Sequence, residues 1–144
     1  MHLIAIAALV CAALFTGAAL YISLVEHPAR LALPDGPLLA QWQPSYRRAL
    51  PIQSGLAVAG GAAGLITGPV LVDWQWFAGS IVLLANWPFT LIVMMRDNKR
   101  LMALAEGQAG AESRAMLVQW GRQHAVRGAL GAGAVVLFAW ALAG

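Results

Sequence analysis

The sequence predicts an all-α integral membrane protein that folds as a four-helix transmembrane bundle. Of its 144 residues, 60% are hydrophobic and only 10% are charged, and the mean hydropathy of +0.72 lies well outside the usual range of soluble domains. Four apolar stretches reach the roughly 20 residues that a helix needs to cross a bilayer core about 30 Å thick. One domain, residues 1–144, is expected, with helices over about residues 3–27, 51–72, 75–97 and 112–143.

The first helix is placed by an apolar run that begins at Leu3. No basic residue precedes this run, and the run is longer than the core of a signal peptide, so we expect a retained helix. Pro28 lacks a backbone N–H and disfavours helical geometry in the residue before it. The first helix is therefore expected to end or bend at His27.

The second helix is expected to begin at Pro51, because proline is tolerated in the first turn. Gly60, Gly64 and Gly68 recur in it at four-residue spacing. Such a stripe lets another helix approach closely. The neighbour can be a helix of the same chain or one of a second copy, so a homo-oligomer through this face stays open.

The third and fourth helices carry their polar residues at distinctive depths. Asn86 and Pro88 lie near the middle of the third helix, which predicts a kink there. From Glu112 onward nothing in the sequence stops a helix, so the fourth helix is expected to extend beyond the bilayer. Trp74 and Trp140 suit the membrane interface at the opposite end.

The basic residues predict the orientation. All nine Lys and Arg residues lie between the first two spans, or between and at the edges of the last two. The positive-inside rule then places both termini outside and the loops 26–50 and 96–123 in the cytoplasm. We expect a bacterial inner membrane. The lipid bilayer, and not nucleic acid, is the partner that this distribution indicates.

A first group of candidate residues closes the first helix. Unpaired carbonyls at a helix end disfavour a carboxylate, so Glu26 needs a compensating cation. Arg30 lies one turn away, and Arg127 of the fourth helix is the alternative. Glu26 and His27 could perform proton chemistry, hold a metal, or form an ion pair that only fixes helix packing.

A second group lies in the third helix. Asn86 is about ten residues from either end of the span, and a polar group at that depth marks a functional site by default. Thr90 and Asn98 continue a polar stripe toward the cytoplasmic side. The alternative is that Asn86 bridges two helices or satisfies the backbone at the kink of Pro88.

A third group opens the fourth helix. At 100° per residue, Trp120, His124 and Arg127 fall within about 60° of one another, whereas Arg122 points away. Together with His27 and Glu26, His124 could act as an acid and base or bind a transition metal or haem. No HxxxH or CxxC pair supports the metal, and an interfacial histidine can also serve packing alone.

These segments resemble the anthrone-oxygenase-like family of small four-helix membrane proteins. The resembling parts are "TGAALYISLVEHPARL", "QWQPSYRRA", "NWPFTLIVM" followed by "DNKRL", and "VQWGRQHAVRG". The resemblance implies oxidation of a lipophilic phenolic substrate, an anthrone, to an anthraquinone with O₂ and without an added cofactor. It implies His124 as the base, with Glu26 and His27 as alternatives, and Arg127 as the group that stabilises an oxyanion.

The resemblance also implies a substrate-binding set. Asn86 would hold a substrate oxygen and Trp120 would stack on the ring system. We add Thr90 and Asn98 of the polar stripe, and Arg30 at the end of the first helix, to the candidate substrate-binding residues. Two other hypotheses stay open. One is a metal or haem protein that uses His27, His124 and Glu26. The other is a non-enzymatic accessory or scaffold protein in which the polar stripe only holds helices together.

Overall fold

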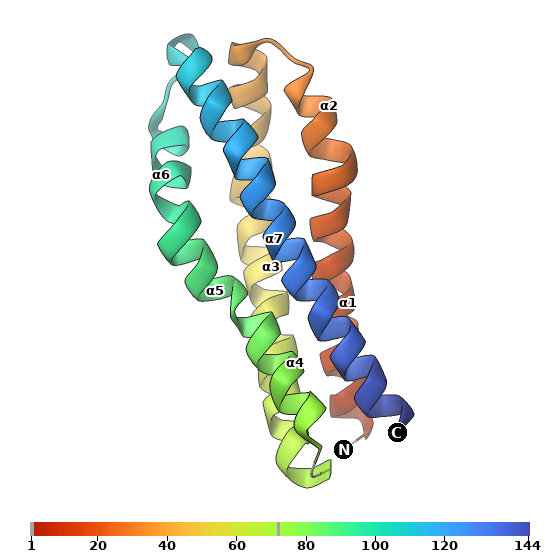
Figure 1. Ribbon diagram of the computed structural model, residues 1–144. Helices are drawn as coiled ribbons and strands as arrows, with labels where there is room; N and C mark the ends of the chain where they lie inside the picture. The colour runs from red at the N-terminus through yellow and green to blue at the C-terminus, as the bar shows by residue number, and fades with distance from the viewer. Residues whose placement is uncertain (1, 72) are drawn as a thin grey trace.

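Four long helices run up and down beside one another in a single bundle (Figure 1). The computed structural model describes residues 2–71 and 73–144, and the described residues contain no strand. All four helices are long and apolar enough to cross a membrane, which confirms the predicted fold class. They span His2–Leu31, Asp35–Leu71, Trp74–Ala103 and Ala111–Ala143.

The first span continues through Pro28 instead of ending near residue 27. It consists of α1 (His2–Tyr21), a π-helical turn η1 (Ile22–Glu26) and α2 (His27–Leu31). In η1 the backbone N–H of His27 donates to the carbonyl of Ile22, five residues back. This wider turn accommodates the proline within one continuous helix, and π-turns of this kind are frequent at functional sites.

The second span, α3 (Asp35–Leu71), begins well before Pro51. Pro37, and not Pro51, is the proline in the first turn of this helix. Pro44 and Pro51 then lie inside the helix. The expected end at residue 72 lies outside the described residues.

The third span is broken in the middle, where Figure 1 shows a change of direction. Its parts are α4 (Trp74–Leu84), α5 (Asn86–Phe89), a π-helical turn η2 (Thr90–Met94) and α6 (Met95–Ala103). Pro88 has no N–H to donate to the carbonyl of Leu84, which lies four residues back. The fourth span is α7 (Ala111–Ala143), preceded by the 3₁₀ turn η3 (Glu106–Gln108).

The glycine stripe of α3 packs inside the chain. A Cβ on Gly60 would lie 2.9 Å from Leu83 of α4, and one on Gly64 would lie 2.8 Å from Phe138 of α7. Both approaches are closer than a real Cβ makes. The small residues therefore serve to bring α3 against its neighbours in the same chain.

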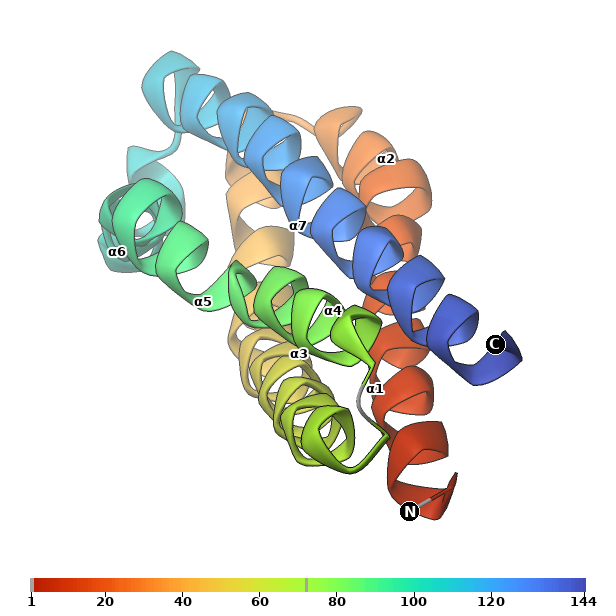
Figure 2. The ribbon, with the colours of Figure 1, turned by 60° about the horizontal axis from the view of Figure 1, so that its bottom comes forward.

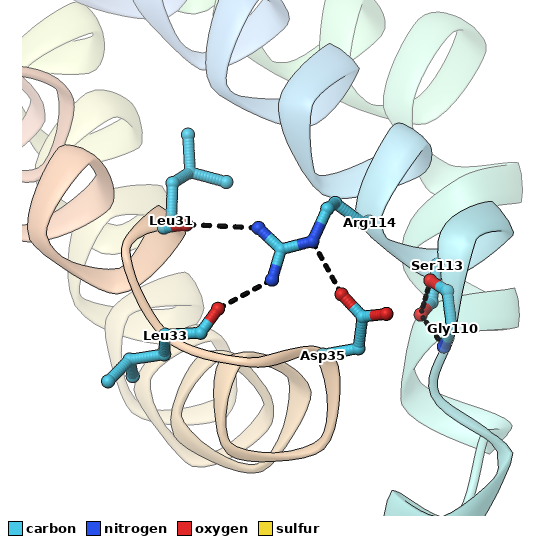
Figure 3. Close-up of polar contacts among 6 residues, drawn as sticks. All are labelled: Leu31, Leu33, Asp35, Gly110, Ser113 and Arg114. Atoms are coloured by element: carbon cyan, nitrogen blue, oxygen red, sulfur yellow. Dashed lines mark hydrogen bonds and ion pairs between the residues drawn. The ribbon is translucent and has the colours of Figure 1, made fainter.

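Arg114 of α7 ties the connection between the first two spans to the fourth helix (Figure 3). Its Nε donates to Asp35, and its two terminal nitrogens donate to the carbonyls of Leu31 and Leu33 at 2.9 and 2.5 Å. These carbonyls follow the end of α2, where no helical donor reaches them. The tilted view of Figure 2 shows α7 running beside α1 and α4, the two helices against which it packs.

Candidate functional site

Three aromatic rings form a column in the half of the bundle that is remote from the chain termini. The indole of Trp120 is stacked on the imidazole of His124, with centroids 4.7 Å apart and planes inclined by 24°. The imidazole of His27 lies 5.1 Å from the ring of Trp120, with the two planes inclined by 53°. All three residues are buried: Trp120 is 5% exposed, His124 1% and His27 4%. We call His27, Trp120 and His124 the ring column.

The ring column depends on a glycine of α7. A Cβ on Gly121 would lie 2.5 Å from both Cδ2 and Nε2 of His27. Because Gly121 leaves this space empty, the His27 ring can lie against the helix backbone, where its Nε2 donates to the carbonyl of Leu117 at 3.0 Å. The other nitrogen of His27, Nδ1, is buried without a partner among the described residues.

His124 is oriented by a serine from the first span. Its Nδ1 lies 3.1 Å from Oγ of Ser23, which is part of the π-turn η1. Which of these two groups donates depends on the tautomer of the ring. With Nδ1 used in this way, Nε2 is the nitrogen that His124 can offer to a ligand.

Glu26 is engaged by its own surroundings and not by Arg127. Its Oε1 accepts hydrogen bonds from Arg30 and from Ser45, the latter at 2.6 Å. The side chain of Arg30 is almost fully buried, whereas that of Glu26 is 23% exposed. Of the two cations that the sequence offered to Glu26, the structure therefore pairs it with Arg30.

A small inner chamber lies beside the ring column. Its volume is about 10 Å³. The residues that line it come from the first, second and fourth spans, and the polar ones are Arg30, Ser45, Tyr46, Gln53, Trp120, His124 and Arg127. Glu26, His27 and Asn98 are not among the residues that line it.

A second cavity of about 160 Å³ opens between α3 and the broken third span, and we call it the lipid-side groove. Its lining includes Leu50, Asn86, Thr90 and Arg127. Trp87 and Leu91 also line it and are about half exposed on the face that a bilayer would cover. The groove and the inner chamber share Leu50 and Arg127, so the two cavities meet at these two residues.

The break in the third span shapes the groove. Nδ2 of Asn86 donates to the carbonyl of Leu83 at 3.0 Å, and Oγ1 of Thr90 donates to the carbonyl of Asn86 at 2.8 Å. Asn86 thus satisfies part of the backbone at the kink, as the structural alternative required. Its Oδ1 remains buried without a partner in the described part of the chain, so it can still accept a hydrogen bond.

Several residues of the two cavities were missed from the sequence. Gln53 of α3 is 3% exposed and lines the chamber, and Trp87 lines the groove. A polar residue within a span is itself a signal, so the depth rule that selected Asn86 should also have selected Gln53. Ser23 carried no such signal, because a serine can bond to its own helix.

The two histidines do not fit a shared metal or haem iron. Each of the two imidazoles packs against the ring of Trp120, with centroids 5.1 and 4.7 Å away. Nε2 of His27 already donates to a carbonyl, and the described residues hold no group of three His, Cys, Asp or Glu side chains that could bind a metal.

The fold and the site define an integral membrane protein with a buried histidine in an inner chamber and a neighbouring groove that shares Leu50 and Arg127 with that chamber. The chain belongs to the anthrone oxygenase family, whose model matches residues 42–137. The matched range contains Asn86, Trp120, His124 and Arg127, while Glu26 and His27 precede it. No curated protein and no solved structure shows significant similarity to the chain. Family membership suggests an oxygenase-like function.

Proposed function

We propose that this protein is a membrane-embedded oxygenase that oxidises a lipophilic phenolic or anthrone-type substrate with O₂. The observation that carries the proposal is the meeting of the lipid-side groove and the inner chamber at Arg127, with His124 in the chamber lining. The family supports the same class of reaction. No cofactor is part of the proposal, because a delocalised carbanion can itself donate an electron to O₂.

The substrate would enter from the bilayer through the groove. Trp87 offers an exposed indole face on which a flat ring system can stack. In this proposal Trp87 takes the stacking role that the resemblance implies for Trp120, because Trp120 is only 5% exposed and already packs against both imidazoles. Oδ1 of Asn86 would accept the hydrogen bond of a phenolic hydroxyl.

His124 would remove the proton from the methylene carbon. In the tautomer that donates from Nδ1 to Ser23, the lone pair of Nε2 is free to act as the base. Arg127 would stabilise the negative charge that the substrate oxygen gains as the carbanion delocalises. Glu26 would neutralise Arg30.

The reaction is balanced without an external reductant, because the substrate itself supplies the electrons. The carbanion and O₂ form a carbon–oxygen bond, and the resulting peroxide anion takes the proton held by His124. Removal of the second methylene proton then breaks the O–O bond and forms the carbonyl, with hydroxide leaving as water. One oxygen atom of O₂ ends in the quinone and the other in water.

Oxygen uptake by the purified protein in lipid nanodiscs tests the proposal. With anthrone as substrate and ¹⁸O₂ as oxidant, we expect uptake above the uncatalysed rate and one ¹⁸O atom in the anthraquinone. His124→Gln should reduce the rate about 100-fold or more, the usual contribution of a general base. His2→Gln, a change of an exposed histidine near the N-terminus, is the matched control.

Two results would count against the proposal in different ways. A wild-type protein that is no faster than empty nanodiscs would overturn the oxygenase function and favour an accessory or scaffold role. Normal uptake by His124→Gln would leave the reaction in place and remove His124 as the base.

A further inference from the structure

The inner chamber is lined by hydrogen-bond donors that have nothing to donate to. Four of its residues carry a buried nitrogen that has no hydrogen-bond partner in the described part of the chain. These atoms are Nε of Arg30, Nε2 of Gln53, Nε1 of Trp120 and Nε of Arg127. Each side chain is at most 5% exposed, so water at the protein surface does not satisfy these groups. Buried donors left without a partner destabilise a fold, which makes four around one chamber unusual.

The charged side chains that line the chamber are positive, so the chamber suits an anion. None of the described residues that line it is acidic. Arg30 is balanced by Glu26 on its outer side, but Arg127 has no carboxylate partner among the described residues. Its guanidinium carbon instead lies 5.6 Å from the centre of the Phe15 ring, where the cation meets the π-face. An unpaired buried cation requires a compensating anion.

The size of the chamber limits which anion can bind. A volume of about 10 Å³ is close to the roughly 10–15 Å³ that one water-sized sphere occupies on the same measure. A monatomic anion fits this space with little adjustment, and a diatomic anion requires the side chains around it to move apart slightly. Carboxylates, phosphates and sulfate are too large.

We propose that the inner chamber is a binding site for a small anion of one or two heavy atoms. The site is derived from the chamber alone, whereas its role in turnover rests on the proposed oxygenase function. In that reaction the anion is superoxide. The substrate carbanion gives one electron to O₂, which leaves a carbon radical and superoxide, and the two then combine through a new carbon–oxygen bond.

The chamber would speed this electron transfer because its donors distinguish the two oxidation states of dioxygen. Neutral O₂ accepts hydrogen bonds weakly, whereas superoxide carries a full negative charge. Preorganised donors and the Arg127 charge therefore stabilise the product of the electron transfer more than its starting state. Gln53 would help to position the anion through the free N–H groups of its Nε2.

Chloride is the probe for the site, and no substrate or oxygen is needed to use it. Thermal unfolding is measured in sodium chloride and in sodium gluconate at equal ionic strength, since gluconate is too large for the chamber. The melting temperature of the wild type should rise with chloride and then saturate, as for a ligand that binds only the folded state. Gln53→Leu should weaken the apparent chloride affinity about tenfold, because it removes one donor to a charged ligand.

The controls separate loss of the anion site from a general loss of stability. Gln75→Leu changes a glutamine that does not line the chamber and should leave the chloride effect intact. Each variant is compared with itself in the two salts, so a general loss of stability does not imitate a lost site, and Gln53→Met serves if Gln53→Leu does not fold. Equal melting curves of the wild type in the two salts would overturn the site. An undiminished chloride effect in both Gln53 variants would overturn its assignment to this chamber.

The role in turnover has its own readout. Chloride should raise the KM for O₂ without changing the KM for the phenolic substrate, and Gln53→Leu should lose much of this inhibition. Chloride that binds but does not compete with O₂ would remove the superoxide role and leave the anion site standing. A wild type without oxygen uptake would overturn the proposed function, while the melting curves would still decide whether the chamber binds an anion.

Discussion

Oγ of Ser23 lies 3.1 Å from Nδ1 of His124, across the interface between the first and the last span. This contact fixes the direction of the imidazole, and in the tautomer that donates from Nδ1 to Ser23 the lone pair of Nε2 is free. Ser23→Ala should therefore lower kcat about fivefold, the equivalent of about 1 kcal/mol for one hydrogen bond, and leave the KM of the substrate almost unchanged. Steady-state oxygen uptake measures both. Ser80→Ala, at a buried serine without a partner in the described residues, is the control and should be neutral.

Gly121→Ala should disturb the ring column. The new Cβ would meet the His27 ring at 2.5 Å, and both the ring and the helix backbone are too constrained to give way easily. We expect the free energy of unfolding to fall by about 1–3 kcal/mol, as for other overpacked positions. Gly133→Ala on the same helix, where the nearest atom is 3.6 Å away, should cost far less in a thermal or denaturant unfolding experiment. Equal losses in the two variants would contradict the packing role of Gly121.

Trp87→Leu should impair binding of the substrate more than the chemical step. Loss of the exposed indole removes a stacking contact of about 1 kcal/mol, which corresponds to an increase in KM of about fivefold with kcat little changed. Trp140→Leu is the matched control, since Trp140 is similarly exposed but packs against Trp74 and does not line the groove. A fall in kcat alone would show that Trp87 does not hold the substrate.

Arg114→Gln should loosen the connection between the first two spans. The change removes the ion pair with Asp35 and leaves the carbonyls of Leu31 and Leu33 without their donor. Because the Arg114 and Asp35 side chains are each 34% exposed, water compensates part of the loss, and we expect a destabilisation of about 1–2 kcal/mol. Arg122→Gln, on the exposed face of α7, should leave the melting temperature unchanged.

Both termini should lie outside the cytoplasm, as the distribution of basic residues predicts. Figure 1 has the two termini at one end of the bundle, so a single experiment can test them together. Alkaline phosphatase fused after Gly144 should be active in the periplasm, whereas a fluorescent protein folded only in the cytoplasm should stay dark at this position. The opposite pattern would invert the orientation and place the ring column on the outer side.

Much of the fold and part of the site could be predicted because they depend on short-range regularities. Helical periodicity is local, so the placement of Trp120, His124 and Arg127 on one face of α7 agrees with their burial, and Arg122 is exposed. Proline rules were less reliable. They locate a missing N–H but do not say whether the chain stops, as expected at His27, or widens into a π-turn, as it does in η1.

The remaining parts of the site depend on distances between spans, which a single sequence does not contain. The sequence could place Trp120 beside His124, but it could not show that the ring of His27 also packs against Trp120. The sequence left two arginines, Arg30 and Arg127, as candidate partners of Glu26. The packing of α2 against α3 brings the carboxylate to Arg30 and Ser45. Ser23 became part of the site only through its contact with α7.

The ring column also determines how freely the sequence can vary at these positions. The rings of His27 and His124 both pack against Trp120, so a substitution at Trp120 changes the surroundings of both histidines, and a substitution at either histidine changes those of Trp120. Effects of substitutions in direct contact are not additive, and coupling energies of about 0.5–3 kcal/mol are usual for such pairs. A replacement tolerated beside one neighbour would fail beside another, so the three positions would be expected to change together, as a unit, during evolution.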